Sequence, residues 1–170
     1  MLKIDMHTHL MPKKMPDFAA KFGYGDFIML DHHREGYARM MQGQRFFREI
    51  KDNCWDADVR IPEYEQFNTQ VQVVCTIPVL FSYWAKPKDG AVVSRFLNDD
   101  LAETIAPHPK NYIGLGTLPM QDTDLAIKEL EHCKKLGFPG VQIGSNINDK
   151  NLDEAEFFPI FKACQELDMA

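Results

Sequence analysis

Two histidines separated by a single residue, His7 and His9, stand near the start of the chain. The residues before them alternate between apolar and polar types over positions 2–6, which predicts a short β-strand. Side chains two apart on a strand point to the same face, so both imidazoles should project together from its carboxyl end. Zinc, nickel, iron and copper all accept imidazole nitrogens as ligands. The spacing therefore predicts half of a divalent metal site, the alternative being two histidines that only hydrogen-bond locally.

Four further residues are candidates for contact with a substrate. Arg48 could form a two-point pair with a carboxylate, or it could be an ordinary surface arginine on a hairpin. Phe81 and Trp84 follow the second expected strand, and Met120 follows the third. These three could line an apolar pocket or simply cover the end of the fold. Surface positions are expected for the remaining histidines, which are His32, His33, His108 and His132.

The elements that must position these residues alternate between strands and helices in the later part of the chain. Residues 11–55 form a long excursion that includes a possible strand over 27–30 and a hairpin with a turn at Gly43. Such long connections often serve a binding site. After it, strands are predicted over 71–78, 112–119 and 140–144, and helices over 56–68, 92–105, 125–136 and 153–167.

Strands that alternate with helices predict a parallel sheet, either open and doubly wound or closed as a (β/α)₈ barrel. No glycine-rich phosphate loop follows the first strand, which counts against a nucleotide-binding open sheet. A metal-ligand pair at the carboxyl end of a strand is typical of a barrel. A barrel needs about 250 residues, whereas this chain has 170. We therefore expect a partial barrel of about four strand–helix units, built as one domain over 1–170 with an insertion at about 11–55.

The composition excludes several classes of partner. The net charge of −6 and the absence of a lysine- or arginine-rich tract argue against nucleic acid. No apolar run predicts a membrane span, and the N-terminus does not resemble a secretory signal. The 4 cysteines are scattered, so free thiols and a cytosolic (cytoplasmic) location are expected.

Several motifs together resemble one known family. The opening segment, residues 4–9, resembles the first motif of the metal-dependent amidohydrolase superfamily. Within that superfamily the chain is similar to the 2-amino-3-carboxymuconate-6-semialdehyde decarboxylase family. The segments that carry this similarity are residues 22–25, 53–56, 78–87, 114–121 and 137–144.

The resemblance implies a TIM-barrel fold, zinc, a homodimer and non-oxidative decarboxylation of 2-amino-3-carboxymuconate 6-semialdehyde to 2-aminomuconate 6-semialdehyde, in the kynurenine route of tryptophan catabolism. It assigns His7 and His9 as the first two zinc ligands and Arg48 as a substrate-carboxylate ligand. The family's other metal ligands, its catalytic histidine and a second arginine from the neighbouring subunit would lie beyond Ala170, so the chain corresponds to the N-terminal half. Two alternatives are an inactive truncated isoform or fragment, and another decarboxylase or hydrolase of the superfamily.

Overall fold

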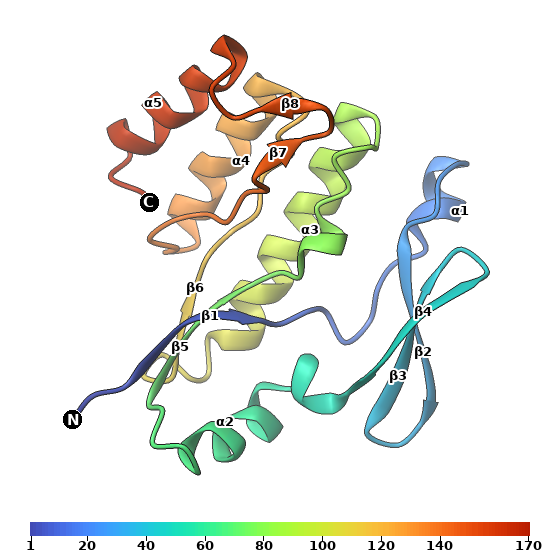
Figure 1. The fold of residues 1–170 in the computed structure, drawn as a ribbon, viewed down its shortest axis with the longest axis vertical. Helices are drawn as coiled ribbons and strands as arrows, with labels where there is room; N and C mark the ends of the chain where they lie inside the picture. Colours follow the sequence, from blue (N-terminus) through green and yellow to red (C-terminus); the bar gives the residue numbers. More distant parts are fainter.

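A parallel β-sheet forms the centre of the protein in a computed structural model that describes residues 1–170. Its strands are β1 (Ile4–His9), β5 (Val71–Cys75) and β6 (Tyr112–Gly114), hydrogen-bonded in the order β1-β5-β6. A parallel bridge between Gly116 and Val141 adds a fourth segment beside β6. Successive segments of the chain are therefore neighbours in the sheet (Figure 1).

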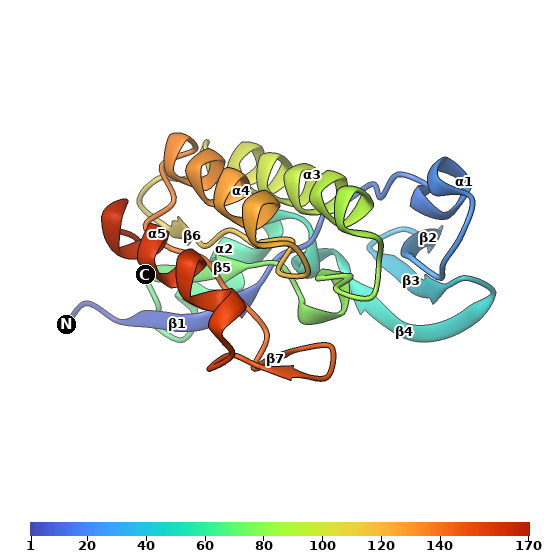
Figure 2. The ribbon, with the colours of Figure 1, turned by 90° about the horizontal axis from the view of Figure 1, so that it is seen from above.

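Helices connect these strands and cover the sheet. The longer ones are α2 (Ala57–Glu65), α3 (Pro87–Ile105), α4 (Thr123–Lys135) and α5 (Phe158–Glu166). Figure 2 shows α3 and α4 lying side by side over the same face of the sheet. Apolar side chains from the sheet and these helices, including Val74, Leu130 and Ile160, form the larger core cluster. The architecture is thus half of a (β/α)₈ barrel, as the strand–helix alternation predicted.

A second, antiparallel sheet occupies the long excursion after β1. It consists of β2 (Ile28–Arg34), β3 (Tyr37–Gln42) and β4 (Arg45–Lys51), and the short helix α1 (Phe18–Phe22) lies beside it (Figure 1). Phe18, Met40 and Trp55 belong to a second core cluster that also contains residues of α3. This cluster attaches the antiparallel sheet to the barrel wall.

Local sequence signals account for many of the boundaries. Asp56 caps α2, since its carboxylate accepts hydrogen bonds from the backbone N–H groups of Asp58 and Val59. Gly43 has a φ of +57° in the turn between β3 and β4, a conformation that favours glycine. The predicted hairpin is therefore present, with Gln42 opposite Arg45 at its end.

The sheet differs from the prediction near its carboxyl edge. The strand expected over 112–119 ends at Gly114, and the one expected over 140–144 is reduced to the bridge at Val141. One physical cause is Asn98 of α3: its side chain accepts from the N–H of Thr117 at 2.7 Å and donates to the C=O of Thr117 at 2.9 Å. Both backbone groups of Thr117 are thereby withdrawn from strand pairing.

Other elements shift or are new. Helix α2 ends at Glu65 rather than at 68, α3 begins at Pro87 rather than at 92, and the strand expected over 71–78 ends at Cys75. The last helix begins at Phe158 rather than at 153, and Pro159 lies in its first turn, where proline needs no hydrogen-bonded N–H. Sequence reasoning missed the small hairpin of β7 (Asn146–Ile147) and β8 (Lys150–Asn151).

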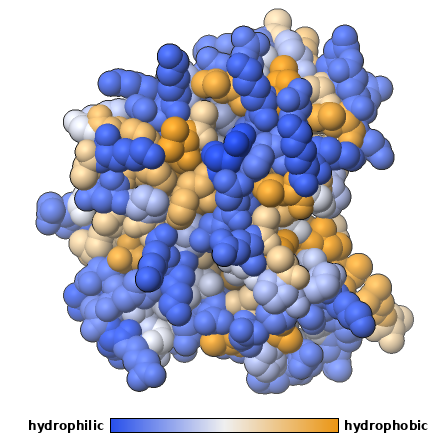
Figure 3. Space-filling model, turned by 180° about the vertical axis from the view of Figure 1, so that it is seen from behind, coloured by the Kyte–Doolittle hydropathy of each residue, from blue (hydrophilic) through white to orange (hydrophobic).

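The outer strand β1 leaves apolar side chains uncovered. Leu2, Ile4 and Met6 are exposed, as is Phe67, which follows α2. Figure 3 shows hydrophobic atoms at the corner of the molecule that carries the N-terminus. No helix combines the length and the apolar character needed to cross a membrane.

Candidate metal and substrate site

The two histidines of the opening motif lie together at the carboxyl end of β1. Their ring centroids are 4.9 Å apart and their planes are perpendicular. His7 is exposed and His9 is partly buried. The pairing of β1 with β5 is irregular between Asp5 and Thr8, just where the first histidine stands. Asp5 itself accepts a hydrogen bond from the backbone N–H of His7 at 3.3 Å.

Hydrogen bonding defines which nitrogen of His9 is free. Its Nδ1 lies 3.1 Å from the carbonyl oxygen of Thr76. A carbonyl only accepts, so Nδ1 carries the proton and Nε2 keeps its lone pair. Burial and the neighbouring His7 lower the pKa of His9 below 6.5, which favours the neutral imidazole that a metal requires. Cys75 also lies near Nδ1, but burial raises the pKa of its thiol to about 11, so it is not a thiolate ligand at neutral pH.

The two imidazoles fit a divalent metal as part of its ligand set. A neutral His9 with Nε2 free and a second imidazole beside it provide two nitrogen donors. No group of three His, Cys, Asp or Glu side chains in residues 1–170 could hold a metal ion. Catalytic zinc sites usually have three protein ligands. The pair offers two nitrogen donors, one fewer than such a site usually has.

Arg60 of α2 is a residue that sequence reasoning missed. It is buried, and its Nη1 donates to the backbone carbonyls of His9 at 3.0 Å and Asn53 at 2.9 Å. Its Nε donates to Gln72 Oε1 at 2.6 Å and its Nη2 to the Tyr64 hydroxyl at 3.1 Å. Arg60 thus holds the end of β1 in place through neutral partners. Its positive charge also contributes to lowering the pKa of His9.

Arg48 lies on β4, where it is exposed and opposite Met40. Its guanidinium carbon is 5.9 Å from the centre of the Phe47 ring, and it forms no hydrogen bond or ion pair within the chain. The other arginines all have polar partners: Arg34 with Glu49, Arg39 with Asp31, Arg45 with Gln42, Arg60 as above, and Arg95 with Glu129. All the donors of Arg48 are therefore available to a carboxylate.

A hollow of about 550 Å³ lies near the carboxyl ends of the parallel strands. Its walls are the loop 78–84 after β5, the segment 142–148 and, from the antiparallel sheet, Gln42. Phe81 and Trp84 both line it; Phe81 is buried and Trp84 is about half exposed (47%). The structure thus brings two of the predicted substrate contacts into one cavity wall.

Met120, the third of these aromatic or apolar candidates, lies elsewhere. Only 1% of it is exposed, and it packs with Leu118 and Leu130 in the core cluster between the sheet and its helices. It does not line the hollow. Its contact with a substrate stays a prediction.

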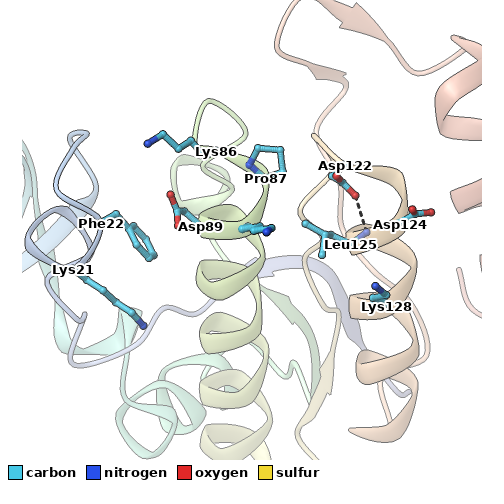
Figure 4. A pocket seen from close by; sticks show the side chains of 10 residues that line it. Lys21, Phe22, Lys86, Pro87, Asp89, Asp122, Asp124, Leu125 and Lys128 are labelled. Atoms are coloured by element: carbon cyan, nitrogen blue, oxygen red, sulfur yellow. Dashed lines mark hydrogen bonds between the residues drawn. The ribbon is translucent and has the colours of Figure 1, made fainter.

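A larger hollow, of about 860 Å³, opens between α1 and the first turns of α3 and α4 (Figure 4). Lysines and aspartates line it, and two of the aspartates are already engaged. Asp89 accepts from the Tyr24 hydroxyl at 2.9 Å, and Asp122 caps α4 by accepting from the N–H of Leu125. Neither histidine of the opening motif lines this hollow, and neither lines the smaller one.

The remaining histidines have local partners. His32 contacts the carbonyl of Lys13, and the other three face carboxylates: His33 pairs with Glu49, His108 with Asp58 and His132 with Asp99. None of them approaches His7 or His9 as a further metal ligand.

Comparison with known proteins defines the class. The model of the amidohydrolase family matches residues 4–170, and this chain belongs to that family. Among curated proteins, 2-amino-3-carboxymuconate-6-semialdehyde decarboxylase of Dictyostelium discoideum is 51% identical over 170 residues, covering 99% of this chain and 47% of that protein. The enzyme of the same name from Caenorhabditis elegans is 37% identical, and the match covers 99% of this chain and 47% of that protein. The chain thus spans about half the length of these relatives.

Solved structures confirm the fold. The 5-carboxyvanillate decarboxylase of Novosphingobium aromaticivorans, crystallised with manganese and 4-hydroxy-3-methoxy-5-nitrobenzoic acid, superposes with a TM-score of 0.74 at 22% identity. The match covers 99% of this chain and 48% of that one. The (β/α)₈ class predicted from the strand–helix alternation is therefore confirmed, with this chain forming part of the barrel.

Proposed function

We propose that this chain provides the first part of the active site of a zinc-dependent decarboxylase that acts on 2-amino-3-carboxymuconate 6-semialdehyde. The observation that carries the proposal is the His7–His9 pair at the end of β1, with Nε2 of His9 left free. The 51% identity with the Dictyostelium decarboxylase over the whole chain supports the choice of substrate. The segment that relatives of twice this length have in addition would supply the other ligands and the catalytic histidine.

Each residue has a distinct task in this proposal. His7 and His9 would hold the metal, which when bound supplies a Lewis acid that polarises the substrate. Arg48 binds a substrate carboxylate with donors that have no partner in the chain. Arg60 positions His9 through the backbone carbonyl. Phe81 and Trp84 exclude water from one side of the conjugated substrate.

The test is to express the chain alone and together with the C-terminal half of the Dictyostelium relative, and to follow loss of the semialdehyde chromophore. We expect turnover only in the combined sample, because two imidazoles do not complete a catalytic zinc site. His7→Ala in the combined sample should abolish it. Zinc-dependent turnover by the 170-residue chain alone would contradict the proposal.

The same assay separates the rival functions. Turnover of 5-carboxyvanillate in place of the semialdehyde would identify a decarboxylase of aromatic acids, and hydrolysis of an amide or ester would identify a hydrolase. No activity in either sample would favour a non-catalytic isoform or fragment. The homodimer and the cytosolic location that the family resemblance and the scattered cysteines suggest are also proposals; sedimentation of the combined sample tests the first.

A further inference from the structure

One buried thiol lies outside both hydrophobic core clusters. Cys75, the last residue of β5, is only 3% exposed, yet it belongs to neither cluster. The other buried cysteine, Cys133 of α4, is a member of the larger cluster. Core packing therefore accounts for Cys133, whereas the contacts of Cys75 have to be sought elsewhere.

The pairing of β1 with β5 places Cys75 directly beside His9. The two residues are partners in the parallel register, and the backbone carbonyl of Cys75 accepts from the N–H of Leu10 at 3.0 Å. The side chains of the pair meet, because Cys75 Sγ lies 3.4 Å from His9 Nδ1. Strand pairing thus fixes a contact between a thiol and the partly buried histidine of the opening motif.

The hydrogen bonds around the sulfur define its role. Sγ also lies 3.4 Å from the backbone carbonyl oxygen of Thr8. A carbonyl only accepts, so the thiol donates its proton to Thr8, and its lone pairs remain to accept from the Nδ1–H of His9. That N–H is therefore shared between two acceptors, the Thr76 carbonyl at 3.1 Å and Cys75 Sγ at 3.4 Å.

Two acceptors on one side of the imidazole restrict both its tautomer and its orientation. If the proton moved to Nε2, the lone pair of Nδ1 would face the Thr76 carbonyl oxygen, and the sulfur would lose its donor. If the ring turned over about its bond to Cβ, a carbon atom would replace Nδ1 beside both acceptors. The arrangement therefore favours the one state in which Nε2 is unprotonated and points away from Thr76 and Cys75.

We propose that Cys75 is a positioning residue for His9, acting as a neutral thiol that keeps Nε2 free for a metal. The inference rests on the proposed function, because it takes His9 as a metal ligand. Groups that accept from the second nitrogen of a metal-binding histidine fix its tautomer and ring orientation and raise its affinity for the metal. A serine hydroxyl, on a shorter bond to Cβ, would not reach Thr8 and His9 equally well.

The test is NMR of isotopically labelled histidine side chains in the chain, first without metal and then during titration with zinc. In wild type we expect the proton of neutral His9 on Nδ1. Cys75→Ala should raise the population of the other tautomer or ring orientation by about 2- to 12-fold, the range of one neutral hydrogen bond. Zinc affinity, read from the same resonances, should fall by about 3- to 10-fold, since a sulfur acceptor is weaker than the outer partners that contribute about 10- to 100-fold.

Cys133→Ala is the matched control, because it truncates a buried cysteine within the core between the sheet and its helices. It should lower the melting temperature and leave the His9 resonances and the zinc affinity unchanged. Cys75→Ser, which retains a donor and an acceptor, should recover part of both quantities, and it provides the comparison with wild type if Cys75→Ala does not fold. A circular dichroism melt identifies the folded variants.

Three results would overturn the proposal: a proton on Nε2 in wild-type His9, no change in either quantity in a folded Cys75 variant, or an equal change in Cys133→Ala. These measurements need no turnover, so they separate this inference from the proposed function. If the combined enzyme consumes the semialdehyde while the state of His9 does not depend on Cys75, only the positioning role is wrong. If that dependence is present and no carbon dioxide is released, the proposed reaction is wrong.

Discussion

Two arginines near the candidate site allow the same substitution to be compared in opposite surroundings. Arg60 is buried with four polar partners, whereas Arg48 is exposed with none in the chain. Methionine retains most of the aliphatic length of arginine and removes every donor. Arg60→Met should therefore destabilise the fold, and Arg48→Met should impair only substrate binding.

The magnitudes follow from the contacts. Arg60→Met leaves acceptors on His9, Asn53, Gln72 and Tyr64 without their donor, in surroundings that water reaches poorly. Each unsatisfied buried group costs about 1–3 kcal/mol, and partial relaxation reduces the sum, so we expect a loss of about 3–5 kcal/mol. Whole domains are stable by only about 5–15 kcal/mol. Arg48→Met should change the unfolding free energy by less than about 0.5 kcal/mol.

Urea unfolding followed by far-ultraviolet circular dichroism measures the unfolding free energies of the two variants. The decarboxylase assay of the combined enzyme measures their kcat and KM. Losing a charge-assisted hydrogen bond of about 1.5–3 kcal/mol should raise KM or lower kcat by one to two decades for Arg48→Met. Arg60→Lys, which restores the charge but not the planar set of donors, should recover only part of the stability. An unchanged urea midpoint for Arg60→Met would show that its hydrogen bonds do not hold the end of β1, and a large drop for Arg48→Met with normal kinetics would reverse both assignments.

Three further predictions concern the metal, a buried carboxyl and a close contact. His7→Ala and His9→Ala should each abolish stoichiometric zinc, measured by elemental analysis after dialysis, and the wild-type metal should be easily removed by chelator; tight zinc that survives loss of His7 would refute the assignment. Burial, together with a nearby glutamate, raises the pKa of Asp100 from 3.8 to about 6, so the native state holds this proton to higher pH than the unfolded chain, and stability is lost as the pH rises through that interval. Asp100→Asn should then stabilise the fold by about 1–3 kcal/mol at pH 7 and have almost no effect near pH 4. An equal effect at the two pH values would contradict the raised pKa of Asp100. Gly25→Ala should destabilise by at least about 1 kcal/mol and shift Trp84 fluorescence, because the new Cβ would lie 2.6 Å from the Trp84 ring and the φ of +83° disfavours alanine; unchanged unfolding and emission would argue against that contact.

Several features could be predicted from the sequence because they depend on residues close together in the chain. The alternation before His7 predicted a strand that ends with both histidines, and β1 covers Ile4–His9. A helix was predicted over 56–68, and the carboxylate of Asp56 accepts the N–H groups of its first turn. The glycine turn at Gly43 predicted the hairpin. Strand–helix alternation was enough to predict parallel pairing, because parallel neighbours require a crossover.

The remaining part of the site depends on contacts between residues far apart in sequence. Arg60 reaches the carbonyl of His9 across 51 residues, and Thr76 determines the tautomer of His9 across 67. Nothing in the neighbourhood of either residue in the sequence indicates these bonds, because they exist only once α2 and β5 have packed beside β1. The hollow likewise forms when Tyr83 joins Gly144. Residue types in the sequence therefore indicate which groups can bind a metal or a carboxylate, whereas tertiary packing orients these groups and leaves Nε2 of His9 free.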